Sequence, residues 1–366
     1  MARTTHFLWA VALLLMSLLF GPAQAEEYFA SRHGLVLGRG MGAPEFAAPG
    51  RLRLAAEGAF YFKTLELFNL DGILGETFTG YRAPVSLRYR PHPHLGVELG
   101  ALLGHDFGDD DRLNAAAPIL RLVYEPTPDV FIIGGTVAPT HWQHDALLDD
   151  TRKLRADVEQ GFQLRADRRT WKHDTWINWR VREGDERAEE FEIGLSNQFR
   201  LWRDLLRLDT QFLWTHAGGQ MSTSGRVEQN LLYLVGFSVG GRYPLGGTLL
   251  EEVRAGYAWL YSRDETDHSP LFKGFGRSYT AHADLRLHPA WRARLFAEVF
   301  DGDRFTATLG DPLYSLDSYD QRGINLLFDV ADDLLRIEVG FVSQGTADQE
   351  NLSYQLAMVW AGWWTP

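Results

Sequence analysis

Three residues in one glycine-rich stretch have the types needed for ester or amide hydrolysis. His216 is followed by Ser222 and Ser224 within the segment HAGGQMSTSG. A histidine can take the proton of a serine hydroxyl and activate it as a nucleophile, provided that a third residue orients the imidazole. The spacing supplies no such third residue. We therefore expect that the chain is not an enzyme and has no catalytic residues, and a hydrolase at this stretch remains the alternative.

A second group of residues offers ligands for a divalent cation. His141 and His144 stand three positions apart, and the carboxylates of Asp145, Asp149 and Asp150 follow. Imidazole and carboxylate groups are common metal ligands, but their orientation normally depends on further hydrogen bonds that the sequence does not show. We favour a different interpretation, in which this stretch is a loop of a β-barrel, as argued below. The loop would fold into the barrel and narrow its channel. No metal and no cofactor are therefore expected.

Charged residues also recur at alternate positions in many segments, where one set of side chains would face a common interior. Rings of arginine or lysine select anions in pores, whereas solvated charges of both signs simply keep a wall wet and paired. Both interpretations stay open. The residues expected to line the pore are Arg53, Arg88, Arg121, Arg165, Lys172, Arg180, Glu192, Arg200, Arg207, Asp209, Arg254, Arg286, Arg292, Arg294, Arg336 and Glu338.

The elements that would position these groups are β-strands, as residues 187–218 show most clearly. Apolar and polar residues alternate strictly on both sides of a polar break at Arg203-Asp204. Alternation of this length predicts a β-hairpin whose strands can cross a bilayer, which takes ~9–11 residues at a ~45° tilt. A two-residue turn at the break places Asn197 opposite Thr210 on the apolar face, as a hydrogen-bonded pair or as a contact with a neighbouring subunit.

About sixteen such strands are expected, and the links between them differ systematically in length. Tight turns such as Pro91-His92-Pro93 follow the even-numbered strands, whereas longer polar links such as 65–80 and 141–154 follow odd-numbered strands. Short turns on one side, long loops on the other and an even strand count are typical of bacterial outer-membrane barrels. The expected strands are 51–64, 81–90, 94–105, 114–125, 130–140, 155–166, 170–182, 189–202, 205–216, 227–242, 250–263, 276–287, 291–301, 318–330, 334–345 and 351–364.

The beginning of the chain has a different character. Residues 1–25 combine a basic start, an apolar run and a small-residue cleavage pattern that ends at Ala25, which predicts a secretory signal peptide. Residues 26–50 show no sustained alternation, and we interpret them as a periplasmic arm or a partial plug. Residues 51–366 are expected to form the transmembrane barrel.

Composition narrows the function classes further. The chain contains no cysteine, which excludes disulfides and thiolate metal sites, and its formal net charge of −12 argues against nucleic acid as a partner. Its 12 Trp, 13 Tyr and 22 Phe are many for a chain with a mean hydropathy of −0.22. A transmembrane barrel produces this combination because only alternate residues meet lipid.

By strand count and loop asymmetry, the chain resembles bacterial outer-membrane β-barrel proteins, and in particular the sixteen-stranded porins. The resemblance covers roughly residues 51–364 and is one of architecture. It implies an all-β fold, a transmembrane antiparallel up-and-down barrel in the outer membrane of a Gram-negative bacterium. The partners it implies are the lipid bilayer, lipopolysaccharide, the outer-membrane assembly machinery and further copies of the chain in a homo-oligomer.

The function expected from these features is that of a channel. We expect a porin-like passage for small hydrophilic solutes, anionic ones if the arginines set the selectivity, or the export of an anionic polymer such as an exopolysaccharide. The alternative is a plugged barrel that serves as an outer-membrane enzyme or as an adhesion or structural scaffold. A lumen closed by residues 26–50 or by an inward loop would favour the alternative.

Overall fold

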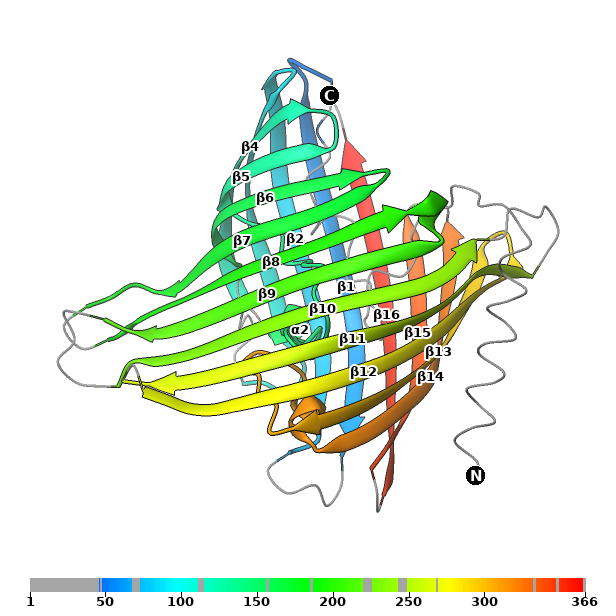
Figure 1. The fold of residues 1–366 in the computed structure, drawn as a ribbon. Coiled ribbons are helices and arrows are strands. Elements are labelled where there is room, and N and C mark those ends of the chain that lie inside the picture. Colours follow the sequence, from blue (N-terminus) through cyan, green and yellow to red (C-terminus); the bar gives the residue numbers. More distant parts are fainter. Residues whose placement is uncertain are drawn as a thin grey trace.

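The computed structural model of the chain is a closed β-barrel (Figure 1). The structure describes residues 46, 48–67, 73–110, 115–155, 158–184, 187–219, 226–242, 249–267, 269–331, 334–346 and 349–364. The predicted signal peptide and nearly all of residues 26–50 lie outside this part of the chain. Within it, no helix is long and apolar enough to cross a membrane.

Sixteen antiparallel strands form the barrel in the described residues, and each pairs with its neighbours in sequence while β16 closes on β1. This confirms the predicted fold class and strand number. Figure 1 shows the strands winding around one lumen with a strong tilt. The strands are β1 (Leu52–Glu66), β2 (Glu76–His92), β3 (Leu95–Asp106), β4 (Ala115–Thr127), β5 (Val130–Thr136), β6 (Gln160–Arg168), β7 (Trp171–Val181), β8 (Glu189–Leu201), β9 (Leu206–Gly218), β10 (Glu228–Arg242), β11 (Leu250–Thr266), β12 (Ser269–His288), β13 (Trp291–Asp303), β14 (Ser318–Ala331), β15 (Leu335–Gly345) and β16 (Glu350–Trp364).

The hairpin of β8 and β9 has the predicted register. Asn197 pairs with Thr210, as the alternation of apolar residues requires. The connection, however, is longer than the expected two-residue turn. A 3₁₀ turn, η2 (Trp202–Asp204), joins the strands, and Trp202, Arg203 and Asp204 all have positive φ angles of 46°, 58° and 71°. A turn with φ > 0 matches the right-handed twist of the paired strands.

Strand length varies around the barrel, and this variation determines what enters the lumen. β12 has 20 residues, whereas β5 has 7 and β6 has 9. The expected strands 130–140 and 155–166 are therefore too long. β5 ends at Thr136, whose carbonyl oxygen accepts a hydrogen bond from Arg121 Nε over 2.7 Å, and the following residues turn inward.

Two links fold into the barrel interior, and we name them loop A (residues 137–155) and loop B (residues 304–317). Loop A contains the short helix α2 (Arg152–Arg155), and loop B contains the 3₁₀ turn η3 (Pro312–Ser315). Leu147 of loop A and Leu313 of loop B are at most 1% exposed, and both belong to a core that includes Leu232 and Leu260 of the barrel wall. An apolar core thus lies within the barrel, in addition to the apolar surface outside it.

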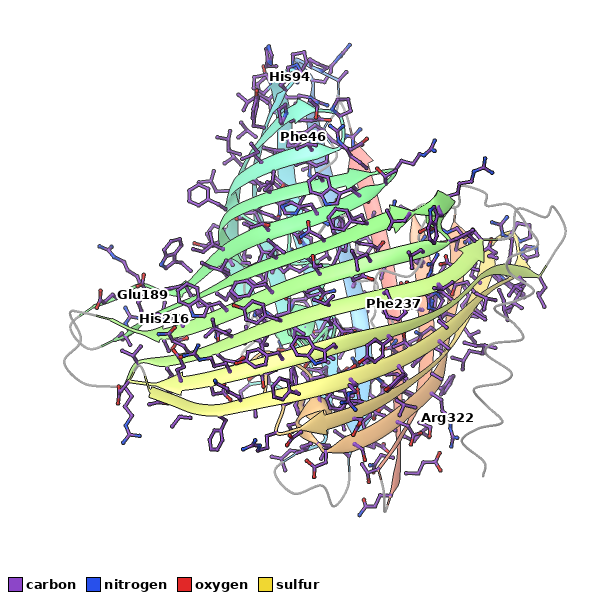
Figure 2. The ribbon with its side chains drawn as sticks, in the orientation of Figure 1. Phe46, His94, Glu189, His216, Phe237 and Arg322 are labelled. Carbon is purple, nitrogen blue, oxygen red and sulfur yellow. The ribbon has the colours of Figure 1, made fainter. Side chains whose placement is uncertain are left out.

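The residues before β1 reach the end of the barrel that carries the tight turns. Phe46 lies there, near His94 (Figure 2). Its ring occupies the position that a side chain at Gly96 would take, so Gly96 provides the room for it. Whether residues 26–50 form an arm or a plug stays a prediction, because all but a few of them lie outside the described residues.

Candidate functional site

Loop A is fixed inside the barrel by hydrogen bonds to the wall and to loop B. The backbone N–H of His144 donates to the Gln211 side chain of β9 over 2.7 Å. The backbone N–H of Asp311 in loop B donates to the Asp145 carbonyl oxygen over 2.9 Å. These contacts confirm that the stretch after β5 folds inward. Among the described residues of this stretch, only α2 (Arg152–Arg155) is helical.

His141 is held by two carboxylates rather than left open to a metal. Its Nδ1 lies 2.9 Å from an Asp174 oxygen and its Nε2 lies 2.8 Å from a Glu159 oxygen, while its ring stacks on Trp176. Burial lowers the pKa of His141, but the Glu159 and Asp174 carboxylates outweigh it and raise the pKa above its ordinary value. An imidazolium with both N–H groups engaged has no lone pair for a metal. His141 is therefore a clamp for loop A.

Four aspartates and one lysine meet where the two loops touch. The Lys63 ammonium of β1 lies 2.9 Å from an Asp150 oxygen. Burial raises the pKa of Asp145 well above its ordinary value, and the neighbouring charges of Asp150 and Asp311 add to this rise. Burial also raises the pKa of Asp311 to about 7, again with help from Asp149. The junction of the loops therefore takes up protons near neutral pH.

A cavity of about 200 Å³ lies between loop A and the wall formed by β7 to β13. Four adjacent inward positions of β10 and β11 have a small side chain or none and leave room for it. Gly236, Ser238, Gly256 and Ala258 line it there. On the opposite side the cavity is bounded by loop A, beginning at Trp142.

Charged side chains of both signs line this cavity, with five cationic and four anionic residues. The positively charged residues that line it are Lys172, Arg207, Arg242, Arg254 and Arg294, and the negatively charged ones are Asp145, Asp209, Glu252 and Asp284. The cations outnumber the anions by one, and the raised pKa of Asp145 lowers the negative charge of the lining further. The arrangement therefore favours an anionic over a cationic solute.

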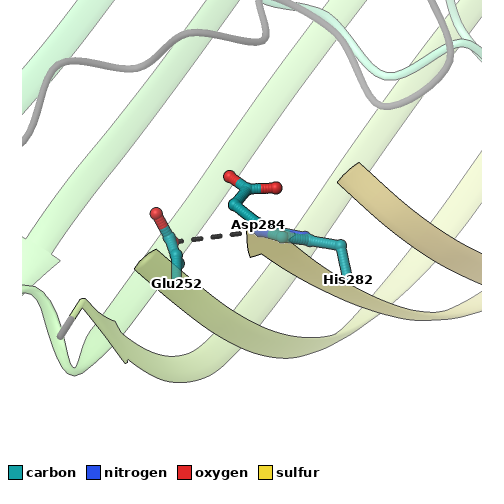
Figure 3. A group of neighbouring side chains, drawn as sticks. All are labelled: Glu252, His282 and Asp284. Atoms are coloured by element: carbon teal, nitrogen blue, oxygen red, sulfur yellow. Dashed lines mark ion pairs between the residues drawn. The ribbon is translucent and has the colours of Figure 1, made fainter. Parts of the chain in front are cut away.

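Glu252, His282 and Asp284 form a group with metal-binding geometry (Figure 3), since one ligand atom from each lies within 4.8 Å of the others. Both carboxylates, however, are already engaged. Glu252 accepts a hydrogen bond from Arg254 Nε over 2.8 Å, and Asp284 accepts two from Arg294 over 2.6 and 2.7 Å. A divalent cation would lie beside these guanidinium groups, and like charges at ~4 Å repel by about 4 kcal/mol per unit pair near a protein surface. We interpret the group as the anchor of the cationic wall.

A second buried network lies on the inner face of β1 to β4. Glu98 accepts hydrogen bonds from Arg88 Nε over 2.8 Å and from Arg121 Nη1 over 2.7 Å. Ser86 also donates to Glu98, and Arg88 reaches Glu57 over 3.0 Å. Arg88 and Arg121, both expected to line the pore, are the two cationic partners of this buried carboxylate.

The other residues expected in the pore are placed as follows. Arg180 and Arg286 are exposed, with side chains 48% and 45% accessible, and they pair with Glu190 and Glu251. That any of the sixteen lines a conducting path stays a prediction. The remaining fourteen are buried or half-buried: Arg53, Arg88, Arg121, Arg165, Lys172, Glu192, Arg200, Arg207, Asp209, Arg254, Arg292, Arg294, Arg336 and Glu338.

His216 lies on the outer surface of the barrel near Glu189, at the end of the barrel that carries the long links (Figure 2). Its ring stacks on Phe191 with 4.8 Å between ring centroids and meets the edge of Trp214. Ser222 and Ser224 lie outside the described residues. The structure thus gives His216 an aromatic surrounding at the rim of the barrel.

The polar pair on the lipid-facing surface belongs to a larger network. Asn197 donates to Thr210 over 3.4 Å, which confirms the expected hydrogen bond. The side-chain oxygen Oδ1 of Asn197 accepts from Trp171 Nε1 over 3.2 Å and lies 2.8 Å from His173 Nδ1. His173 Nε2 in turn lies 2.9 Å from Thr175 Oγ1. Mutual hydrogen bonds make these groups tolerable where lipid offers none. Contact with a further copy of the chain stays a prediction.

The closed barrel, its apolar outer surface and its charged interior define the protein class: an outer-membrane β-barrel protein of a Gram-negative bacterium. Exposed Phe60, Leu120, Phe162, Phe237 and Val299 exemplify the outer surface. A family model defines a narrower group than this protein class. Residues 45–331, more than half of the chain, match the model of the lipid A 3'-O-deacylase-type family, and the chain belongs to that family. No curated protein matches the chain.

Solved structures of other bacterial outer-membrane proteins are similar to the chain. Outer-membrane-expressed OmpT of Vibrio cholerae has a TM-score of 0.51 and 10% identity, over 87% of this chain and 100% of that chain. The outer membrane channel DcaP of Acinetobacter baumannii has a TM-score of 0.45 and 9% identity, over 85% of this chain and 96% of that chain. At 10% identity the similarity to OmpT concerns the fold alone.

The family match corrects the expectation that the chain is not an enzyme, because a deacylase is an enzyme. That expectation rested on the absence of a third catalytic residue within one contiguous stretch. In a barrel, neighbouring hairpins bring residues from distant parts of the sequence to the same point of the rim. The distance in sequence was therefore the wrong criterion.

Proposed function

We propose that the protein is an outer-membrane enzyme that hydrolyses an acyl ester of a phosphorylated glycolipid of the lipid A type. The family match over residues 45–331 carries this proposal. Such a substrate lies in the outer leaflet, so its ester bonds meet the outer surface of the barrel at the rim with the long links. A catalytic site for it must therefore be sought there and not in the lumen.

The rim around His216 has the properties that this reaction requires. The rings of Phe191 and Trp214 offer an apolar surface for an acyl chain, and His216 offers a general base beside it. Farther around the same rim, Arg263 and Arg277 expose 42% and 59% of their side chains. Guanidinium groups at this level can bind the phosphates of a glycolipid through charge-assisted hydrogen bonds.

Replacing His216 with glutamine is expected to lower the rate of acyl release at least about 100-fold, because a general base typically contributes 10²–10⁴-fold. The measurement is mass spectrometry of free fatty acid released from lipopolysaccharide by the purified protein in vesicles. His105→Gln is the matched control, since His105 also lies among aromatic rings, beside Tyr81 and Phe107. Absence of acyl release from the unaltered protein would refute the proposed activity, and equal losses in both variants would refute the role of His216.

A second candidate function is the passage of small anionic solutes through the lumen, and the cationic cavity beside loop A favours it. Polymer export would require a wider path than one in which two loops pack together. The test is the reversal potential of the reconstituted protein across a potassium chloride gradient, which we expect to show anion preference. An electrically silent protein would contradict this function and leave the enzymatic proposal untouched.

A further inference from the structure

We infer that the cavity beside loop A binds one small polyhydroxylated carboxylic acid, of the size of a sugar acid. This inference deepens the second candidate function by naming its solute class, and it rests on that function only for its biological role. Three properties of the cavity support it, namely its charge, the hydrogen-bonding groups that lack partners at its wall, and its volume.

The charge of the lining selects for an anion. Five cationic side chains line the cavity, and two of its four carboxylates, Glu252 and Asp284, are held in ion pairs. Arg207, for example, lies 2.6 Å from an Asp204 oxygen and 3.3 Å from a Glu252 oxygen. Such pairs fix the guanidinium groups in place, so that an entering carboxylate would meet a preorganised positive surface.

Two donors at the wall lack hydrogen-bond partners in the described residues. They are Nη1 of Arg254, a residue 3% exposed, and Oγ of Ser196, a residue 4% exposed. A buried donor without a partner costs about 1–3 kcal/mol. A ligand carboxylate that reaches these groups after a small side-chain rotation would remove this cost.

Two acceptors of the same lining also lack partners in the part of the chain that the structure describes, namely Oε1 of Gln143 and Oε1 of Gln198. The amide Nε2 group of each glutamine donates a hydrogen bond that fixes the orientation of its Oε1 atom. Gln143 Nε2 donates to the Phe212 carbonyl oxygen over 2.8 Å, and Gln198 Nε2 donates to Asp209 over 3.0 Å. Free acceptors call for ligand donors, and hydroxyl groups supply them whereas a bare anion such as chloride does not.

The volume sets the size of the ligand. At the ~15 Å³ that one water needs by this measure, a cavity of about 200 Å³ holds on the order of ten waters. This corresponds to a six-carbon sugar acid and is too small to enclose an oligosaccharide. A carboxylate for the cationic wall and hydroxyls for the amide oxygens together describe such a molecule.

Isothermal titration calorimetry of the full chain in detergent tests the inference, with glucuronate, glucose and inorganic phosphate as probes. Glucuronate is expected to bind at least tenfold more tightly than glucose, which lacks the carboxylate, and than phosphate, which is poor in donors. Absence of glucuronate binding, or equal binding of glucose, would overturn the inference. Equal binding of phosphate would show an unspecific anion site and would also overturn it.

Two variants connect binding to this cavity. Ser238→Leu fills the space and is expected to weaken glucuronate binding at least tenfold, whereas Val235→Leu, on the lipid-facing side of the same strand, is expected to leave it unchanged. Ser196→Ala removes a donor without a partner, so the fold should tolerate it while binding falls several-fold. Unchanged binding in Ser238→Leu would place the ligand elsewhere. If glucuronate binds but the protein does not conduct, the proposed passage of solutes is refuted while this inference stands. If the protein conducts but glucuronate does not bind, this inference alone is refuted.

Discussion

Replacing Glu98 with alanine is expected to lower the free energy of unfolding by about 3–5 kcal/mol, the usual cost of breaking a buried ion pair on one side. Glu98 is 2% exposed and accepts hydrogen bonds from both Arg88 and Arg121, which are themselves 5% and 4% exposed. Without the carboxylate, Arg121 keeps only carbonyl partners and Arg88 keeps only Glu57 as its acid partner. Two guanidinium groups would then lie in the interior with too little negative charge.

The measurement is equilibrium unfolding by guanidinium chloride of the protein folded in lipid vesicles, followed by tryptophan fluorescence. Glu125→Ala is the control, because Glu125 forms an ion pair with Arg90 at the barrel end, where both side chains are about one-quarter accessible. Pairs of that kind contribute ~1 kcal/mol or less. Equal destabilisation by the two variants would show that the buried network carries no special weight.

Acidification from pH 8 to pH 5 is expected to tighten the docking of loop A. The pKa of Asp311 is about 7 in the folded protein, against an ordinary value of 3.8, so its protonated form is favoured by folding. Docking is therefore weakened as pH rises from about 4 to 7 and is at its weakest above 7. His141 acts in the same direction: its pKa is raised above 6.5, so its contribution is complete below that pH and is lost as pH rises through the folded pKa.

Hydrogen–deuterium exchange over residues 144–149, corrected for intrinsic rates, measures this docking. Protection is expected to rise on acidification and to depend less on pH in Asp311→Asn, which mimics the protonated side chain and retains the acceptor for the Leu313 N–H. Asp303→Asn is the control, since the Asp303 side chain is 72% accessible. Protection that falls on acidification, or that keeps its full pH dependence in Asp311→Asn, would contradict the proposed role of the junction.

The fold could be predicted from the sequence because its determinants are local. An alternation of period two states which residues face lipid, and each tight turn fixes the register of one hairpin, as the pairing of Asn197 with Thr210 illustrates. Once the neighbouring strands are paired in this way, only the pairing of the first strand with the last is undetermined. The sheet must close, because an open edge cannot persist in a membrane. The bounds were wrong at β5 and β6, where the chain turns inward after Thr136, and at β2 and β12, which begin at Glu76 and Ser269, before the expected residues 81 and 276.

The candidate site was less predictable, because contacts between distant residues create it. His141 meets Glu159 and Asp174 only after the chain has turned into the lumen and β7 has returned. The cavity depends on the small residues Gly236 and Ser238 of β10, which leave space inside the barrel. In an alternating pattern, a glycine or serine at an inward position does not by itself predict a cavity. The grouping of His282 with Glu252 and Asp284 could not be predicted either, since a single histidine in a strand does not show which residues lie beside it.

The seam between β1 and β16 has a consequence for biosynthesis. Leu54 pairs with Trp364, so the first and last strands of the sheet meet across almost the whole length of the chain. Pairing at such a sequence separation must overcome a large loss of chain entropy, which makes it a late and slow step. Until it occurs, both edges of the sheet hold unpaired N–H and C=O groups that lipid cannot satisfy. Ribosomal synthesis and membrane insertion therefore have to be separate events, with the nascent polypeptide kept from aggregating until its last strand is available.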